Sequence, residues 1–511
     1  MGRRQQEETE RKYDVDAATV FPNLAETSAV ESVGQPGTFL LEAVYFDTPR
    51  LDLARNGVTL RRRTGGHDEG WHLKVPAGQD TRTELREPLG SERTVPETFR
   101  ARVHALARGR TLEPVATVRT ERREYPLRDA EGAVLALVAD DNVRALRLGG
   151  GDQELAWREW EVELDQGPRS LLDAVEARLL DAGASPAAAR SKLARVLGEP
   201  ATARTSRHSA IDMRAGKGKV ALQQVMTAQL EKYLARLLEQ DAGVRAGHTE
   251  SVHRVRIAAR RLRSTLTTFR PVLESGATDP LREELRWLGE QFAQARDAQV
   301  LREHLGAVLA SEPAELVIGP VGTRLDDELS AAYTTGREAA MRALDSDRYV
   351  RLLDSIEELI ASPPLRSSGQ RSAKKALPGL LARDVRRLER AVQAIGYAGS
   401  PGERDVAFHD ARKKAKRLRY GAESATPVLG KPARSLATDT KALQEALGVH
   451  QDTVVARGRL RQYGMQAHLD GQNAFTFGRL HALEQARAER AEADFADLWA
   501  VFRKKRLKRW R

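Results

Sequence analysis

The chain has 511 residues, of which 30% are charged, and its formal net charge is +11. This length predicts two or three domains. The chain contains no cysteine, which excludes disulfides and thiolate metal sites. No stretch approaches twenty consecutive apolar residues, and the first residues lack the apolar core of a secretory signal, so we expect a cytoplasmic protein without a membrane span.

The charge is unevenly distributed along the chain. Residues 1–200 contain 29 Lys and Arg against 34 Asp and Glu, a net charge of −5. Residues 201–511 contain the remaining 54 and 38, a net charge of +16. The second part of the chain is therefore expected to bind a polyanion.

The first predicted strand is charged on one face. Residues at i, i+2 and i+4 of a strand point to the same side, so residues 8–12 (ETERK) place Glu8, Glu10 and Lys12 together. Further segments repeat the pattern, with one-sided groups at Arg61 and Arg63, at His72 and Lys74, at Arg82, Glu84 and Arg86, and at Glu159, Glu161 and Glu163. A solvent-exposed face explains one such strand, but five favour a closed sheet with a polar interior.

The order of these segments resembles the CYTH domain, the family of triphosphate tunnel metalloenzymes. Residues 8–12 resemble its ExExK motif, and residues 45–48 (YFDT), residues 60–63 (LRRR), Lys74, the strand of three glutamates and Lys192 follow in the order of the family. The resemblance covers about residues 5–200. It implies an antiparallel β tunnel, with flanking helices, that binds a triphosphate and a divalent metal.

Charge assigns roles within such a tunnel. A triphosphate requires cations, and the candidates are Arg61, Arg63, Lys74, Arg119 or Arg122, and Lys192. Glu84 is assigned to the same triphosphate site. Mg²⁺ or Mn²⁺ prefers carboxylate oxygens. The expected ligands are Glu8, Glu10, Glu161 and Glu163, followed by Glu159 and by Asp140 or Asp141. Lys12 would hold the phosphate or assist proton transfer, and the sequence does not separate these catalytic roles. His72 either shares this site or is structural.

A composition change near residues 199–219 predicts a linker at residues 201–216. Beyond it, the Ala-, Leu-, Arg- and Glu-rich sequence with helical spacing predicts an all-α domain over residues 217–505. Residues 253–263 (HRVRIAARRLR) and 409–419 (HDARKKAKRLR) are copies of one motif, and acidic Asp297 and Asp452 follow at matching distances. This duplication predicts two pseudo-symmetric repeats, at about residues 217–361 and 379–505.

Each copy forms a basic stripe, because its positions 0, +3, +7 and +10 lie within about 80° of helix arc. The two stripes are His253, Arg256, Arg260 and Arg263, and His409, Arg412, Lys416 and Arg419. The motifs resemble the CHAD domain, the conserved histidine α-helical domain. The resemblance implies a helical bundle that binds inorganic polyphosphate. Gln451 in the second copy replaces Arg296 of the first, which leaves the role of that position open.

The sequence thus predicts an α+β multidomain protein: a metal-dependent inorganic triphosphatase tunnel followed by a polyphosphate-binding helical bundle. The alternatives are a non-catalytic polyphosphate binder and a nucleotide triphosphatase or adenylate cyclase on the same tunnel. Nucleic acid is a weaker expectation because only 5% of the residues are aromatic, which limits stacking on bases. The cytoplasm, including polyphosphate granules, is the expected location. The sequence does not indicate the oligomeric state.

Overall fold

The computed structural model describes residues 4–78, 80–90, 94–149, 154–198, 220–507 and 510. The chain divides into two compact units, Met1–Arg207 and His208–Arg511. The predicted linker, residues 201–216, lies outside the described residues.

The first unit is a closed antiparallel barrel. Its long strands pair in the order β1-β6-β5-β4-β3-β7-β8-β9, and β9 pairs again with β1, which closes the sheet. These strands are β1 Arg4–Val15, β3 Gly37–Asp47, β4 Thr59–Thr64, β5 Gly70–Gly78, β6 Thr81–Glu87, β7 Glu113–Arg128, β8 Val134–Arg147 and β9 Glu154–Leu164. The short strands β2 Ser32–Val33 and β10 Ser185–Pro186 pair with β7 and β1. The predicted β tunnel is confirmed.

The barrel has its two large apolar clusters outside and most of its buried charged side chains inside, beside a smaller inner apolar cluster. In β5, Trp71 and Leu73 belong to an outer apolar cluster, whereas His72 and Lys74 point the other way, because successive side chains alternate between the faces of a strand. Trp160 and Val162 of β9 likewise lie in an outer cluster. The apolar side chains of these two clusters therefore lie between the barrel and the helices that cover it. The charged side chains lie in the interior.

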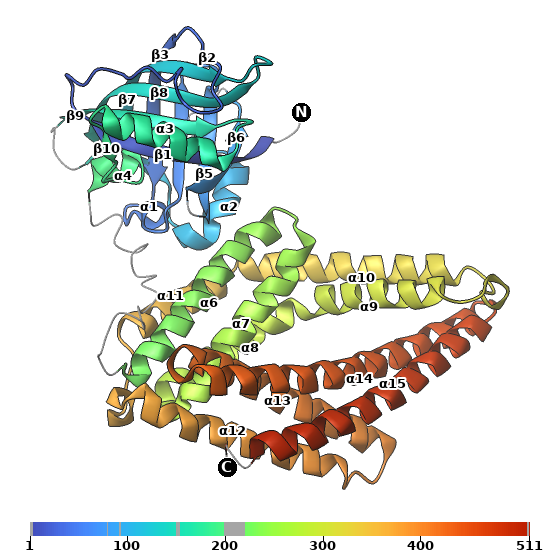
Figure 1. Ribbon diagram of the computed structural model, residues 1–511. Helices are drawn as coiled ribbons and strands as arrows, with labels where there is room; N and C mark the ends of the chain where they lie inside the picture. The colour runs from blue at the N-terminus through green and yellow to red at the C-terminus, as the bar shows by residue number, and fades with distance from the viewer. Residues whose placement is uncertain are drawn as a thin grey trace. The chain divides into compact units, whose positions relative to one another are not determined.

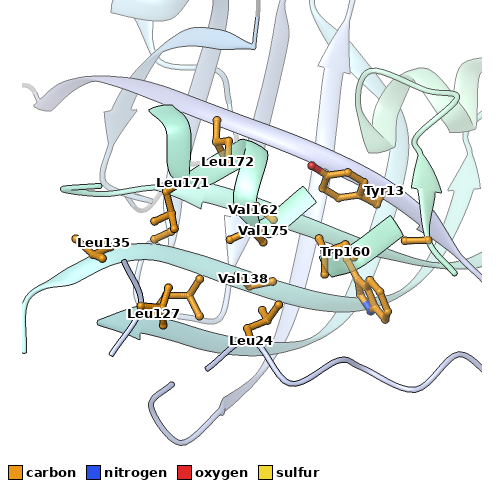
Figure 2. Close-up of a cluster of buried hydrophobic side chains, with 14 residues drawn as sticks. Tyr13, Leu24, Leu127, Leu135, Val138, Trp160, Val162, Leu171, Leu172 and Val175 are labelled. Atoms are coloured by element: carbon orange, nitrogen blue, oxygen red, sulfur yellow. The ribbon is translucent and has the colours of Figure 1, made fainter. Parts of the chain in front are cut away.

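Helices cover the outer face. Leu171, Leu172 and Val175 of α3 (Arg169–Asp181) pack on β7, β8 and β9 with Trp160 and Val138 (Figure 2). Elsewhere, α1 (Asp52–Arg55) and α2 (Glu97–Ala107) pack on β3 to β6 through Leu53, Phe99 and Val103. Burying a side chain of this size contributes about 1.5–3 kcal/mol, so these outer clusters stabilise the barrel.

Within the described residues, the second unit consists of helices and their connections, with isolated β-bridges between Ala221 and Ser372 and between Leu273 and Leu365. Its long helices are α6 Leu222–Arg245, α7 Thr249–Phe269, α8 Ser275–Gln291, α9 Ala293–Ala310, α10 Val321–Leu344, α11 Asp347–Ala361, α12 Ala373–Ile395, α13 Pro401–Leu429, α14 Lys431–Leu469 and α15 Phe475–Phe502. No helix in the described part of the chain is long and apolar enough to cross a membrane.

The duplication is visible in the helices. The two copies of the basic motif lie on α7 and α13, and the helical segment that follows is α8 with α9 in the first half and the continuous α14 in the second. Phe292 separates α8 from α9. Figure 1 shows two long hairpins, α9–α10 and α14–α15, whose outer ends meet, where Leu305 and Leu325 pack with Leu460 and Phe477. The predicted all-α bundle of two halves is confirmed.

Candidate functional site

The inner face of the barrel collects most of the charged residues predicted from the sequence. They surround a cavity of about 70 Å³. Its lining includes Glu8, Glu10, Lys12, Arg61, Arg63, Lys74, Arg122, Glu161, Glu163 and Lys192. Glu84 and Glu159 are buried beside them, in contact with Lys74 and Lys192 respectively.

A buried acidic cluster lies on one side of the cavity. One carboxylate oxygen each of Asp141, Glu159 and Glu161 lies within 4.8 Å of the other two. The ammonium of Lys192 contacts all three, at 2.8, 2.6 and 2.8 Å. Although burial lowers the pKa of Lys192, Asp141 and Glu159 outweigh it and raise that pKa well above its usual value.

A helix start positions Lys192 in this cluster. Helix α4 (Lys192–Leu197) begins after Ser191, whose hydroxyl accepts a hydrogen bond from the backbone N–H of Ala194 at 3.1 Å. Leu193 and Val196 pack against the inward-facing apolar residues of β3, β7 and β8. The first residue of the helix is thereby held at the acidic cluster.

Arg122 joins the acidic cluster from β7. Its guanidinium donates two hydrogen bonds to Asp141, at 2.8 and 2.7 Å, and one to Glu161 at 2.7 Å. Such forked, charge-assisted bonds fix both partners. Burial raises the pKa of Asp141, but Lys192 and Arg122 reverse this and lower it, so the carboxylate stays ionised.

Glu8 and Glu10 lie with other cations. Lys74 is 2.5 Å from Glu8, and Lys12 is 3.0 Å from Glu10. Burial raises the pKa of Glu8 to about 7, with Lys74 opposing it. For Glu10, the effect of burial is overcome by Lys12 and Lys74, which lower the pKa to about 2. The two glutamates of one motif therefore differ in protonation near neutral pH.

The two arginines of β4 differ in their surroundings. Arg61 donates to the Tyr45 hydroxyl at 3.4 Å, and Arg63 forms an ion pair with Asp68. Burial, followed by Arg61 and Arg122, lowers the pKa of Arg63 to about 9. This crowding of cations would be relieved by an anion in the cavity.

Two predicted residues lie on the outer face instead. Arg119 is 75% exposed and pairs with Glu42 outside the barrel. Asp140 accepts hydrogen bonds from Arg158 and Trp160 on the outer side of β8. Both placements follow from the alternation of side chains along a strand. Arg122 of β7 and Asp141 of β8 have the opposite parity to Arg119 and Asp140, and they point toward the cavity. We therefore remove Arg119 and Asp140 from the candidate site and keep Arg122 and Asp141.

Sequence reasoning did not assign roles to three further residues that line the cavity. Tyr45 is contributed by β3, and Arg82 and Arg86 by β6. Arg82 lies 3.7 Å from Glu10, and Arg86 lies 3.3 Å from Glu8. The alternating charges of β6 were the available signal for both arginines.

His72 is buried with an acceptor at each ring nitrogen. Nδ1 lies 2.8 Å from a carboxylate oxygen of Glu84, and Nε2 lies 2.8 Å from the carbonyl oxygen of Asp68. Burial raises the pKa of Glu84, but the hydrogen bond to His72 and the charge of Lys74 lower it below its usual range. Burial lowers the pKa of His72 to about 3, with the charges of Arg61 and Arg63 acting in the same direction and the hydrogen bond to Glu84 opposing them. Two facing acceptors nevertheless require a proton on each nitrogen, so we assign His72 as an imidazolium.

This assignment predicts a spectroscopic result. In the wild type at neutral pH, the nitrogen-15 shifts of His72 should show both ring nitrogens protonated. In Glu84→Gln the amide can donate to Nδ1, so the ring should become neutral. A neutral His72 in the wild type would contradict the assignment.

The residues fit a divalent cation. Three buried carboxylates at one point form a hard-oxygen donor set, and Lys192 shows that a cation is accommodated there. Asp141, Glu159 and Glu161 are thus the structural candidates, while Glu8, Glu10 and Glu163 line the same cavity. Carboxylate oxygens alone do not discriminate between Mg²⁺ and Mn²⁺.

In the helical unit, the two basic stripes lie close to each other. Burial and then the charges of Arg412 and Arg260 lower the pKa of Lys416 to about 7, so the first-half Arg260 approaches a lysine of the second half. Arg260 also acts on Arg412 and on His253. Residues far apart in sequence therefore form one cationic surface, which we call the stripe surface.

The duplicated acids pair with duplicated arginines. Asp297 lies 2.8 Å from Arg256, and Asp452 lies 3.8 Å from Arg412. The first copy has Arg296 where the second has Gln451, and this difference changes the surroundings of the two motif histidines. Gln451 accepts a hydrogen bond from Nδ1 of His409 at 2.5 Å, whereas burial and Arg296 lower the pKa of His253 to about 4.

Comparisons with known proteins agree with both units. The model of the CYTH domain matches residues 6–195, and the model of the CHAD domain matches residues 228–461. Rv2226, an uncharacterized protein of Mycobacterium tuberculosis strain H37Rv, is 39% identical over 499 residues, covering 94% of each chain. MT2285, an uncharacterized protein of strain CDC 1551, matches to the same extent. The chain belongs to the family of proteins in which a CYTH domain is followed by a CHAD domain.

Solved structures resemble single parts of the chain. PptA from Streptomyces chartreusis is 22% identical with a TM-score of 0.47, covering 55% of this chain and all of its own. The CHAD domain from the plant Ricinus communis is 26% identical with a TM-score of 0.44, covering 56% of this chain and 94% of its own. The putative adenylyl cyclase HpAC1 from Hippeastrum, described as having a dominant triphosphatase activity, is 17% identical with a TM-score of 0.25, covering 37% of this chain and 94% of its own.

Proposed function

We propose that the barrel hydrolyses inorganic triphosphate with the help of a divalent cation. The observation that carries the proposal is a buried cavity lined by both arginines or lysines and carboxylates. A pure polyanion binder requires only the cations, whereas hydrolysis of a phosphoanhydride also requires a metal site. Membership of the CYTH family supports the same reading.

The side chains divide into two functions. Arg61, Arg63, Lys74, Arg122 and Lys192 would bind phosphate oxygens, and the buried carboxylates would hold the cation. When bound, a divalent cation neutralises charge on the phosphates and lowers the pKa of a water. Lys12, held by Glu10 and Glu161, is placed to hold a phosphate oxygen or a proton.

The cavity favours an inorganic substrate over a nucleotide. Tyr45 is the one aromatic side chain among the described residues of its lining, and its hydroxyl is bonded to Arg61. Stacking on a nucleobase would need an exposed aromatic face. We therefore rank nucleotide triphosphatase or cyclase activity second.

A phosphate-release assay tests the proposal. The full chain should release phosphate from triphosphate in the presence of Mg²⁺ or Mn²⁺, and release should stop with a chelator. ATP and pyrophosphate should be poorer substrates. Binding of triphosphate without any metal-dependent hydrolysis would instead support the non-catalytic alternative.

We propose further that the stripe surface binds inorganic polyphosphate. Cations at this density repel one another, and Lys416 illustrates the cost through its lowered pKa. A linear polyanion would relieve that repulsion, and arginine forks match phosphate oxygens.

Lys416 gives this binding a predicted pH dependence. Because its pKa is lowered to about 7, the ammonium is charged below pH 7 and loses its proton as pH rises. Polyphosphate affinity should therefore fall between pH 6 and 8, by about threefold to tenfold. Lys416→Arg keeps its charge and should flatten the profile in calorimetric titrations. An equal decline in the variant would rule out Lys416 as the titrating group.

A further inference from the structure

One carboxylate of the tunnel lining is not used by the proposed hydrolysis. Asp68 lies in the hairpin of residues 65–69, which connects β4 to β5, and it lines the cavity. Its carboxylate forms an ion pair with Arg63, and the Asp68 side chain is 30% exposed whereas that of Arg63 is 7% exposed. Asp68 therefore occupies a guanidinium that we also assign to a phosphate oxygen.

The backbone of this hairpin is held against β3. Gly65 has a φ of +80°, which favours glycine, and a Cβ at this position would clash with the carbonyl oxygen of Leu40. The ring of His67 contacts the ring of Phe39 edge-to-face, with centroids 4.8 Å apart. These close contacts fix the backbone on the N-terminal side of Asp68.

His72 holds the same hairpin from inside the barrel. Its Nε2 lies 2.8 Å from the carbonyl oxygen of Asp68, and its Nδ1 lies 2.8 Å from Glu84, which is fully buried. Neither contact uses the carboxylate of Asp68. The carboxylate can therefore leave Arg63 by a change of side-chain rotamer while the backbone stays in place.

Asp68 lies on the wall of the barrel opposite the acidic cluster. In the closed sheet, β3 and β7 separate β4 from β8, and β1 and β6 separate β5 from β9. Among the described residues, the carboxylates that converge on one point are Asp141, Glu159 and Glu161 of β8 and β9. A carboxylate of that cluster that gives up a cation can hold the metal instead. Asp68 lacks this exchange, so its effect at Arg63 is to compete with phosphate.

The outcome of this competition depends on how much of the cavity an anion contacts. Displacing Asp68 opposes the binding of every anion that reaches Arg63 by the same amount. A triphosphate offsets this loss through other cations of the lining, such as Lys74 and Lys192. The products, orthophosphate and pyrophosphate, reach fewer of these cations. Weakening substrate and transition state alike raises KM and leaves the chemical step unchanged.

We infer that Asp68 is a competing anion that sets the affinity of the tunnel for phosphate chains and promotes the release of products. This role depends on phosphate binding in the tunnel as proposed, and it assigns to Asp68 product release and not bond cleavage. Asp68 acts through Arg63, so it is a positioning residue. The anions concerned are linear phosphate chains that place one end at Arg63.

Removing the carboxylate tests this role. Asp68→Asn keeps the shape of the side chain and the backbone carbonyl that faces His72, and Asp68→Ala removes every polar atom of the side chain. Calorimetry with tripolyphosphate, on the full chain without divalent metal, should show about tenfold tighter binding to both variants. The control is Glu69→Gln, which removes the next carboxylate of the hairpin. Glu69 is exposed and lies outside the cavity lining, so the affinity should be unchanged.

Steady-state kinetics add a measurement that a loosened hairpin would move in the other direction. In both Asp68 variants, KM for triphosphate should fall, and inhibition by pyrophosphate should strengthen by a similar factor. A hairpin that had lost its support would bind triphosphate more weakly and raise KM.

The outcomes separate this role from the proposed hydrolysis. Tighter binding in Asp68→Asn alone would assign the gain to the new amide and contradict the inference, and unchanged or weaker binding in both variants would overturn it. Calorimetry requires no turnover, so a wild type without phosphate release would overturn the proposed hydrolysis and leave the binding comparison intact.

Discussion

Replacing Glu161 with Gln is expected to lower metal-dependent phosphate release by about a thousandfold, because one substitution disrupts both parts of the cavity. Glu161 contributes to the acidic cluster and also contacts Lys12, Lys192 and Arg122. Loss of its charge weakens the cation site and frees these three cations to hold product. Initial rates with triphosphate, measured over a series of metal concentrations, provide the test.

A matched substitution outside the barrel serves as the control. Glu42→Gln removes a carboxylate that is 63% exposed and pairs with Arg119 on the outer face. It should leave the rate unchanged. The fold of Glu161→Gln should persist, since Lys192 and Arg122 keep Asp141 as a partner, and circular dichroism would verify this. Wild-type rates in a folded Glu161→Gln protein would show that the cavity is not the catalytic centre.

Reversing Arg256 and Arg412 to Glu is expected to weaken the binding of long polyphosphate by about a hundredfold at moderate salt. Each reversal removes a stripe cation and places a carboxylate beside Asp297 or Asp452. Triphosphate hydrolysis should be unaffected, because the barrel holds its own cations. Calorimetry over a range of salt concentrations measures the effect, and the salt dependence of affinity should also become weaker.

The control reverses two cations of the same helices outside the stripes, Arg254 and Lys414. Arg254 is exposed, and Lys414 pairs with Asp410 at 3.1 Å. The milder pair Arg256→Gln with Arg412→Gln addresses misfolding, since it adds no negative charge. Unchanged polyphosphate affinity in both stripe variants would place the polyanion on another surface.

Strand parity explains which parts of the barrel site could be predicted from the sequence. Where a motif contains several charges in one phase, as in Glu8, Glu10 and Lys12, any register keeps them together, and the structure places all three at the cavity. Adjacent charges such as Asp140 and Asp141 require the absolute phase, which a single sequence does not supply. The outer partners Arg158 and Trp160, which fix Asp140, become neighbours only in the folded sheet.

Helical periodicity was sufficient for the stripes but not for the arginines that gather around Asp279 and Asp384. Arg256 and Arg260 share a face of one helix, so local spacing identifies them. Arg282, Arg387 and Arg417 come from three helices, and only tertiary packing brings them together.

The charged side chains inside the barrel are already paired with one another, so a ligand that enters must replace existing ion pairs. A lone cation among Asp141, Glu159 and Glu161 would displace Lys192 and leave an ammonium without a counter-charge. A lone triphosphate would draw Arg122 away from Asp141 and leave carboxylates unpaired. With both ligands bound, the displaced cations would contact phosphate oxygens and the freed carboxylates would hold the metal. If the barrel binds both ligands as proposed, each would raise the affinity for the other by the same factor, and the empty barrel would select the metal–triphosphate complex.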